Sequence, residues 1–410
     1  MAQQAVTRAG YLDMLIPWRE KQPVKVITGV RRCGKSTLLA QYVEYLKTTG
    51  VSREQIVFIN FEDARYGDLW DYKSLHAYIE KRLDKKRFTY IFLDEVQLCA
   101  EFERAVNSLA LKKKTDLYIT GSNAYLLSGE LATLLSGRYV EIPMLPFSFA
   151  EYYDFTGRGD PKTAFNAFLE YGAFPYIALL KRQDAMVKTY IDGIYNTIIV
   201  KDVAQRQRIN DLSLLEDIVK FLCSAVGSPV SAKKISDTIN SSGRKISVNT
   251  VDAYLRALCE SFIFYRVQRY DIKGKQHLKT LAKYYIVDTG IRNLLVSGAS
   301  SDLGHLLENT VFLELLRRGR RVSTGKIDTP GEREVDFVAE GGGEVAYYQV
   351  AASALNQDTL DRELRPLQAI RDNYPKYLLT LDEFLPRANY NGIRKLNALD
   401  WLLGKLPLPE

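Results

Sequence analysis

The sequence predicts an α/β protein of several domains, on the basis of three observations. Residues Gly29 to Ser36 read G-V-R-R-C-G-K-S, a complete G-x-x-x-x-G-K-[ST] phosphate-binding motif between a β-type run and a helical run. A second apolar run ends in the adjacent carboxylates Asp94 and Glu95. The chain has 410 residues, whereas single domains usually contain about 100–200. We therefore expect two or three domains, the first organised around the phosphate-binding motif.

The composition is that of an ordinary globular protein, with 46% hydrophobic and 26% charged residues. No run reaches the roughly 18 apolar residues of a membrane span, and the N-terminus lacks the pattern of a signal peptide. Four dispersed cysteines and three histidines indicate neither a disulfide framework nor a zinc site. We expect a cytoplasmic protein without a membrane partner.

The phosphate-binding motif is placed where its chemistry requires. The run Val24 to Thr28 reads as a strand, and Thr37 to Leu46 has helical spacing, so the motif opens a helix N-terminus whose N–H groups can cradle a triphosphate. Lys35 can reach the β- and γ-phosphates, and Ser36 can offer its hydroxyl to Mg²⁺. We therefore predict ATP and Mg²⁺ as cofactors. The predicted nucleotide contacts are Gly29, Arg32, Gly34, Lys35, Ser36 and Thr37.

The next elements complete the pattern of a nucleotide-hydrolysing site. After a strand at 55–60 and a helix at 75–83, the apolar strand 88–95 closes in Asp94 and Glu95. Asp94 can hold Mg²⁺ together with Ser36, and Glu95 can orient the attacking water or accept its proton. Strand ends often carry solvated acids, but this pair follows the phosphate motif by one strand unit, which favours the catalytic interpretation.

Two further positions are candidates for contacts with the γ-phosphate. The strand that begins at Asp116 ends in Gly-Ser-Asn, so Ser122 or Asn123 could contact the phosphate or the water, and the sequence does not choose between them. An ordinary turn is the alternative. Arg138 precedes the strand Tyr139 to Pro143 and could act as an arginine finger, in its own subunit or in a neighbour. A surface arginine is equally consistent with this position.

Motifs along the chain resemble those of a large family of bacterial and archaeal AAA-type ATPases that carry a C-terminal domain of uncharacterised function. They are V-I-T-G-V-R-R-C-G-K-S, I-N-F-E-D, I-F-L-D-E-V-Q, I-T-G-S-N-A, L-S-G-R-Y and L-P-F-S-F-A-E, in that order. The resemblance covers nearly the whole chain. It implies a P-loop NTPase αβα sandwich, then a winged helix-turn-helix, then an α/β domain that resembles the PD-(D/E)xK nuclease core. The expected domains are an ATPase core at 1–145, a helical lid or connector at 146–210, the winged helix at 211–295 and the nuclease-like domain at 302–410.

The expected winged helix carries the excess positive charge of the chain. Apolar spacing predicts helices at 214–226, 232–239 and 248–258, followed by a hairpin of strands 262–269 and 284–288. Between Ser231 and Lys283 there are eleven Lys/Arg and four Asp/Glu, whereas the remaining residues balance at 45 each. This is the footprint expected of a nucleic-acid-binding module. A solvated basic surface, or an adaptor that contacts protein, is the alternative.

If this module binds DNA, the helix 248–258 enters the major groove. Asn249 and Thr250 could then face bases, while Arg244 and Lys245 and the wing lysines Lys273, Lys275 and Lys279 would face phosphates.

The C-terminal segment shows the element order of the nuclease core but not its full set of site residues. The predicted elements are a helix at 304–317, strands at 320–323, 334–339 and 345–351, a helix at 359–370 and a strand at 376–381. Such a nuclease needs a helix Glu, an Asp and an acid-x-Lys pair. Glu308 and Asp336 are present, but Gln349 and Ala351 stand where the second acid and the lysine belong. We predict an inactive domain, unless Lys326 or another basic residue substitutes.

The sequence thus favours Mg²⁺-dependent ATP hydrolysis coupled to DNA binding or remodelling, by a homo-oligomer with a degenerate nuclease-like domain. The alternative is a nucleotide-controlled signalling switch or scaffold whose winged helix binds a protein partner.

Overall fold

The chain folds into two compact units. One consists of Met1–Pro146 with Glu260–Phe262, and the other of Phe147–Cys259 with Ile263–Glu410. A computed structural model describes residues 6–121, 135, 137–180, 184–205, 209, 211–274, 276–296, 302–327 and 333–405. Within these residues, no helix combines the length and the apolarity needed to cross a membrane.

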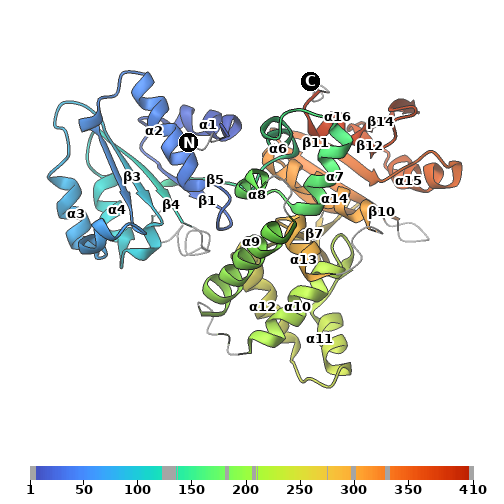
Figure 1. Cartoon of the computed structure of the whole chain (residues 1–410). Helices are drawn as coiled ribbons and strands as arrows, with labels where there is room; N and C mark the ends of the chain where they lie inside the picture. The colour runs from blue at the N-terminus through green and yellow to red at the C-terminus, as the bar shows by residue number, and fades with distance from the viewer. Residues whose placement is uncertain are drawn as a thin grey trace. The chain divides into compact units, whose positions relative to one another are not determined.

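The first unit is built on a parallel five-stranded sheet with the order β2-β3-β4-β1-β5 (Figure 1). The strands are β1 (Val24–Thr28), β2 (Ile56–Asn60), β3 (Thr89–Asp94), β4 (Thr115–Thr120) and β5 (Tyr139–Pro143). The helices are α1 (Ala9–Leu15), α2 (Lys35–Thr48), α3 (Tyr72–Glu80) and α4 (Phe102–Ala110), with single turns η1 (Ile16–Trp18), η2 (Arg53–Gln55), η3 (Ala64–Leu69) and η4 (Val96–Leu98). Because β4 lies between β3 and β1, its last residue is adjacent to both strands that carry the predicted site.

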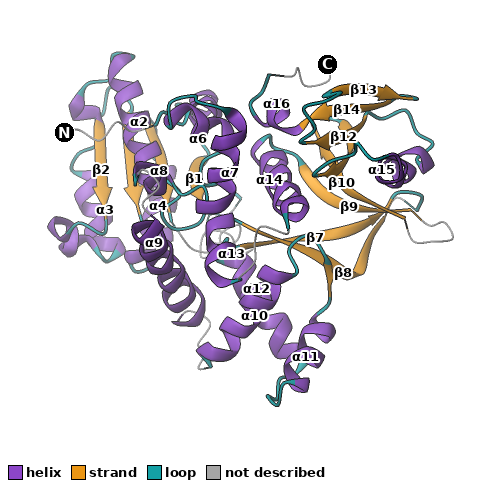
Figure 2. Ribbon diagram, turned by 45° about the vertical axis from the view of Figure 1, so that its right-hand side comes forward, coloured by secondary structure: helices purple, strands orange, loops and turns teal. Residues whose placement is uncertain are grey.

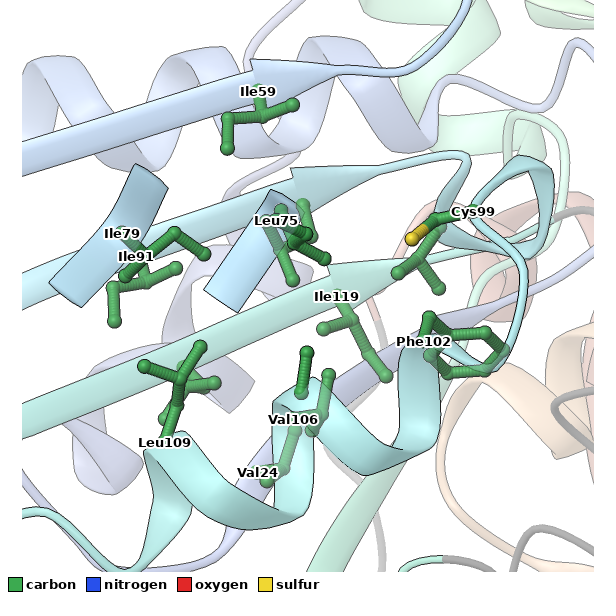
Figure 3. Close-up of a cluster of buried hydrophobic side chains, with 14 of the residues drawn as sticks. Val24, Ile59, Leu75, Ile79, Ile91, Cys99, Phe102, Val106, Leu109 and Ile119 are labelled. Atoms are coloured by element: carbon green, nitrogen blue, oxygen red, sulfur yellow. The ribbon is translucent and has the colours of Figure 1, made fainter. Parts of the chain in front are cut away.

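Alternation of side chains along these strands creates two apolar faces. On one face, aliphatic residues of β1, β2, β3 and β4 pack against α3 and α4 in a buried cluster (Figure 3). Each fully buried Ile or Leu in such a cluster contributes about 1.5–3 kcal/mol. On the other face, Tyr42 of α2 contacts the rings of Phe92 and Tyr118 at centroid distances of 6.3 and 5.0 Å. The unit is therefore a three-layer αβα structure, as the sequence predicts.

The second unit begins with helices, and a distant aspartate fixes the turn between two of them. These are α6 (Phe149–Phe155), α7 (Pro161–Tyr171), α8 (Pro175–Leu179) and α9 (Asp184–Thr197), which continues as the π-helical segment η6 (Ile198–Gln205). Gly172 ends α7 with φ +89°, and a Cβ there would lie 2.3 Å from Oδ1 of Asp288. The carboxylate of Asp288 accepts the N–H of Ala173 at 2.5 Å and that of Ile291 at 3.1 Å. The turn between α7 and α8 is thus held by a residue more than a hundred positions away in the sequence.

The next elements follow the order helix, strand, helix, helix, strand, strand. They are α10 (Leu212–Ser224), β6 (Pro229–Val230), α11 (Ala232–Ser241), α12 (Val248–Glu260), β7 (Phe264–Asp271) and β8 (Gln276–Ile286), followed by α13 (Thr289–Leu295). The three predicted helices are present with ends shifted by two residues at most. The second hairpin strand is longer than predicted, since β8 pairs with β7 from Gln276 onward.

A nine-stranded sheet with the order β13-β14-β12-β11-β10-β9-β7-β8-β6 runs through the second unit (Figure 2). Its remaining elements are α14 (Leu303–Arg317), β9 (Arg321–Ile327), β10 (Arg333–Gly341), β11 (Glu344–Ala351), α15 (Gln357–Ala369), β12 (Lys376–Thr380), β13 (Arg387–Tyr390), β14 (Ile393–Asn397) and α16 (Ala398–Leu402). Strand β7 pairs in parallel with β9. The hairpin β7–β8 therefore belongs to the same sheet as the C-terminal strands, a connection that the sequence did not predict.

Adjacent tyrosines on β11 define the two faces of this sheet, because successive side chains alternate. Tyr347 belongs to an apolar cluster that includes the leucines of α15. Tyr348 lies against Trp401 of α16, with ring centroids 5.8 Å apart. Phe337, which pairs with Tyr348, contacts Phe312 of α14. Helix α15 thus covers one face, and α14 and α16 cover the other.

Candidate functional site

The phosphate-binding motif forms the turn between β1 and α2, at the carboxyl end of the parallel sheet. Gly29 has φ +143°, and a Cβ there would lie 2.1 Å from the carbonyl oxygen of Met144. The close approach of the two backbones therefore requires glycine. Gly34 is the N-cap residue of α2 with φ +109°, and Arg32 is left-handed with φ +64°. The first N–H groups of α2 follow directly, so the turn presents the anion-binding end of a 14-residue helix.

Lys35 is buried against its own loop. Its ammonium donates to the carbonyl oxygens of Gly29 at 3.0 Å and Val30 at 3.1 Å. Ser36 and Thr37 occupy the exposed first turn of α2, and Arg32 is also exposed. The predicted phosphate-loop residues are thus contiguous around one turn.

Arg8 supports the loop from the N-terminal segment, although the sequence analysis did not select it. Its guanidinium is 1% exposed and donates to the carbonyl oxygens of Cys33 at 2.9 Å and Leu145 at 2.8 Å. The loop is therefore tied to the chain that follows β5. An arginine outside any motif gave no sequence signal for this role.

Asp94 ends β3 beside the loop, and a threonine from the neighbouring strand fixes it. The hydroxyl of Thr120 donates to Oδ1 of Asp94 at 2.6 Å and accepts the backbone N–H of Glu95 at 3.0 Å. The Ser36 hydroxyl is close enough to the Asp94 carboxyl to favour its ionised form. The structure thus brings together the two residues that the sequence assigned to Mg²⁺. Thr120 was missed, and only the strand order β3-β4-β1 could have indicated it.

The electrostatics of Asp94 fit a divalent cation. Burial raises the pKa of its carboxyl, although the hydrogen bonds from Thr120 and Ser36 oppose this effect. Its Oδ2 atom is buried and has no hydrogen-bond partner among the described residues. Because a buried carboxylate oxygen normally has a partner, the unmatched atom suits a hard cation with oxygen ligands.

Glu95 follows in a left-handed conformation, with φ 55° and ψ 47°. The turn η4 brings Gln97 back toward it, and Nε2 of Gln97 donates to Oε2 of Glu95 at 2.5 Å. Gln97 was not selected from the sequence, although it lies within the quoted motif I-F-L-D-E-V-Q.

Among the remaining nucleotide-site candidates, the structure describes Arg138 and does not bring it to this edge. Ser122 and Asn123 lie outside the described residues. Arg138 is exposed and immediately precedes β5, where its carbonyl accepts the N–H of Val24 at the start of β1. Arg138 therefore lies at the amino end of the sheet. The length of β1, about 13 Å at about 3.3 Å per residue, separates it from the phosphate-binding loop.

The predicted DNA-contacting residues lie in two places. Arg244, Lys245 and Asn249 are exposed around the start of α12, and Lys273 is exposed in the turn after β7. Thr250 donates its N–H to Ser247, and Arg244 forms an ion pair with Asp217 at 3.0 Å. Lys275 lies outside the described residues.

The prediction that Lys279 lies in the wing loop is wrong. Strand β8 begins at Gln276, because its pairing with β7 continues through His277 and Leu278 to the end of that strand. Lys279 therefore lies within the strand, next to a shift in register.

Two cations of the basic segment are buried. Arg269 is 8% exposed, and its guanidinium lies 3.7 Å from the Glu334 carboxylate. Lys283 is 4% exposed. The excess of positive charge on the surface is therefore smaller than the sequence count implies.

Lys283 lies at the centre of a carboxylate cluster in the second unit. Its Nζ is 3.0 Å from Glu308 of α14, 2.9 Å from Glu334 and 3.5 Å from Asp336, both of β10. The hydroxyl of Tyr285 also donates to Glu308, at 2.6 Å. The structure thus brings Glu308 and Asp336 together, as the sequence predicts, and supplies a basic residue from β8.

The charges of this cluster compensate one another. Burial alone lowers the pKa of Lys283, but the charges of Glu308, Asp336 and Glu334 outweigh it and raise that pKa. Burial and the charge of Glu308 raise the pKa of Asp336 to about 8, while Lys283 opposes the rise.

Gln349 takes part in this region through its amide, and no cation site is formed there. Its Nε2 donates to Glu363 at 2.9 Å, and its Oε1 accepts the N–H of Asp336 at 3.3 Å. Ala351 is buried at the end of β11. Across the described part of the chain, no three His, Cys, Asp or Glu residues are grouped so as to hold a metal ion.

Comparisons with known proteins agree with this geometry in the first unit. The profile of a family described as an AAA domain matches residues 21–153, and that of a domain of unknown function matches residues 162–302. The chain is also similar in structure to a Walker-type ATPase of Pyrococcus abyssi, with a TM-score of 0.51 and 16% identity, over 72% of this chain and 97% of that chain. This likeness concerns the fold alone.

Two relatives extend the comparison along the chain. An uncharacterized protein of Methanocaldococcus jannaschii is 29% identical over 366 residues, which are 85% of this chain and 79% of that protein. An uncharacterized protein of Haemophilus influenzae is 38% identical over 409 residues, which are 98% of this chain and 100% of that protein. The match to an AAA domain identifies the chain as an AAA-type P-loop protein. The chain therefore belongs to the family of the Haemophilus influenzae protein.

Proposed function

We propose that the phosphate-loop site binds ATP and hydrolyses it with the help of Mg²⁺. The observation that carries this proposal is the unmatched, buried Oδ2 of Asp94 beside Ser36 at the carboxyl end of β3. These two residues would hold Mg²⁺, which when bound supplies positive charge near the phosphate oxygens.

The other residues of the site divide the remaining work. The ammonium of Lys35 has three donors and gives two to loop carbonyls, which leaves one for a phosphate oxygen. The N–H groups at the start of α2 complete the phosphate cradle. Glu95 orients the attacking water or accepts its proton, and Thr120 fixes Asp94 and Glu95 together through one hydroxyl.

ATP turnover by matched variants tests this assignment. Lys35→Ala is expected to abolish turnover, whereas Lys47→Ala, which removes an exposed lysine from the same helix, leaves it unchanged. Glu95→Gln is expected to lower kcat by about 10²–10⁴-fold, the range for a general base, while nucleotide binding persists. Undiminished turnover in Lys35→Ala would show that the site has been assigned wrongly.

We further propose that hydrolysis is coupled to DNA through a winged helix formed by the elements from α10 to β8. Three features support it: the order of these elements, the exposed Asn249 at the start of α12, and the exposed cations on α11, on α12 and in the turn between them. Those cations are Lys233, Lys234, Lys245 and Arg256. Asn249 and Thr250 would face bases, and Lys245 and Lys273 would face phosphates. The ion pair with Asp217 makes Arg244 a weaker candidate.

DNA affinity and ATP turnover should be measured with duplex, single-stranded and branched DNA over a salt series. Lys245→Ala is expected to weaken binding to all sequences and to reduce the salt slope by about 1. Arg158→Ala, at an exposed ion pair outside the module, serves as the control. Absent binding, together with turnover indifferent to every DNA, would favour the alternative of a nucleotide-controlled switch that contacts protein.

We also propose that the chain forms a homo-oligomer in which Arg138 contacts the nucleotide of a neighbouring copy. Its place at the amino end of the sheet supports contact with a neighbour rather than with its own loop. Lys35→Ala and Arg138→Ala variants, each inactive alone, are expected to regain part of the turnover when mixed. In the mixed oligomer, the intact loop of an Arg138→Ala copy can lie next to the intact Arg138 of a Lys35→Ala copy. A mixture without turnover would contradict this role. The sensor role of Ser122 or Asn123 stays a prediction.

For the C-terminal part we propose a nuclease-like fold without nuclease activity. The neutral Gln349 and Ala351 support this, as does the engagement of Glu308, Glu334 and Asp336 with Lys283. Incubation with DNA and Mg²⁺ or Mn²⁺ should give no cleavage. Cleavage that Asp336→Ala abolishes would overturn the proposal.

A further inference from the structure

We propose that Gln97 is a positioning residue for ATP hydrolysis, which acts by holding the carboxylate of Glu95. This inference rests on the proposed function of the phosphate-loop site. Its basis is the hydrogen bond from Nε2 of Gln97 to Oε2 of Glu95 at 2.5 Å. A donor to an ionised carboxylate makes a stronger and more directional bond than a neutral pair does.

The local backbone is shaped for this contact. Glu95 adopts a left-handed conformation that is uncommon outside glycine, and the single turn η4 follows it at once. Thr120, from the neighbouring strand, holds the N–H of Glu95 at 3.0 Å. The turn thereby brings the side chain of residue 97 back to that of residue 95. The backbone of Glu95 is fixed by one hydrogen bond, and its carboxylate by another.

The second amide atom of Gln97 indicates that this contact faces a ligand site. Its Oε1 is buried and has no hydrogen-bond partner among the described residues. The opposite amide orientation would place an oxygen against the Glu95 carboxylate, so the donor must face Glu95. The unmatched acceptor then remains for a further donor, such as a water in the site. A glutamine that only stabilised the turn would have no reason to leave this atom unmatched.

Gln97→Met preserves the length of the side chain and removes both amide groups. We expect kcat for ATP to fall by about tenfold with KM nearly unchanged, because the contact orients the water-activating group and not the nucleotide.

Gln97→Glu gives the sharper signature. When ionised, the new carboxylate repels Glu95 and cannot donate, whereas its protonated form can donate an O–H. Turnover by this variant relative to wild type is therefore expected to recover as the pH falls, whereas Gln97→Met, which has no titratable group at this position, shows no such recovery. A glutamine with a merely structural role would give no recovery in either variant.

Two controls separate the possible failures. Gln55→Met removes a buried glutamine of the same unit, which donates to the carbonyl of Phe88 away from the site. It should leave kcat and the pH profile as in wild type. In a Glu95→Gln background, Gln97→Met should cause no further loss. If Gln97→Met alone has the kcat of wild type, the inference fails while the proposed hydrolysis stands. The same holds if the effects of Gln97→Met and Glu95→Gln multiply fully in the double variant. If Glu95→Gln itself turns over normally, the proposed function fails first.

Discussion

Two groups of carboxylates lie next to buried lysines in this protein, and they differ in what neutralises them. Lys35 and Lys283 are each 4% exposed. The ammonium of Lys35 is held by two neutral carbonyl groups, and the nearby Asp94 keeps one oxygen unmatched. The ammonium of Lys283 is held by three acidic side chains from two elements. In the first arrangement, the charges of Lys35 and Asp94 can still interact with a bound anion and a bound cation. In the second, the charge of Lys283 is neutralised by side chains of the protein itself.

The difference shows that a buried lysine beside acids is not by itself a sign of a reaction site. Burial of unpaired charge is costly, so the surrounding structure must either supply counter-charges or receive them from a ligand. Lys35 fits the second case, because its protein partners carry no net charge. Lys283 fits the first, and it joins β8 to α14 and β10 as part of the fold.

The largest expected effect is on stability, from removal of the second lysine. Lys283→Met leaves Glu308, Glu334 and Asp336 without their cation and is expected to lower the free energy of unfolding by about 3–5 kcal/mol. Denaturant unfolding measures it, with Lys188→Met at an exposed position of α9 as control, expected within about 0.5 kcal/mol. Equal decreases in the free energy of unfolding of the two variants would mean that the ion pairs of Lys283 do not stabilise the fold.

The second effect separates the two groups by their response to ligand. Wild type with Mg²⁺ and ATP at about 100 times the dissociation constant is expected to gain about 2.7 kcal/mol of stability. Asp94→Asn should lose the part of this gain that depends on Mg²⁺, because it removes the charge that would hold the cation. Asp336→Asn should keep it. Thermal unfolding with nucleotide alone and with nucleotide plus Mg²⁺ measures the difference. A loss in Asp336→Asn would place the cation in the other group.

The third effect is the pH dependence of stability that Asp336 of the second group is expected to cause. The pKa of Asp336 is raised to about 8 in the fold, compared with an ordinary value near 3.8. Between about pH 4 and pH 8 the folded state therefore keeps a proton that the unfolded state releases. Its contribution to stability is present at low pH and is lost as the pH rises through this window, with a slope of at most about 1.4 kcal/mol per pH unit.

Asp336→Asn should remove this slope, and unfolding measured from pH 5 to pH 9 tests it. The ionisable groups that interact with Asp336 include Lys283 and Tyr285 of β8, Glu308 of α14 and Glu363 of α15. Their titration remains in the variant, so the informative quantity is the difference between the two profiles. Parallel profiles would mean that Asp336 is ionised throughout the range.

The sequence predicted those features that depend on contiguous residues. The motif from Gly29 to Ser36, the strand Tyr139–Pro143 and the helices α10, α11 and α12 all appear with the predicted ends or within two residues of them. Each is encoded by local chemistry, through backbone freedom at glycine and the periods of strand and helix. The AAA-type nature of the first unit is confirmed by the family match, while the winged-helix and nuclease-like assignments and the domain boundaries stay predictions.

The tertiary structure alone decided which distant groups meet. Thr120 reaches Asp94 only because β4 lies beside β3, and Lys283 reaches Glu308 only because β8 belongs to the C-terminal sheet. In the sequence, Lys283 belongs to a basic run and reads as part of a charged surface. The sequence alone does not distinguish a charged residue on the surface from one in the core. Its partners depend on strand order and burial, which the local periodicity of the sequence does not reveal.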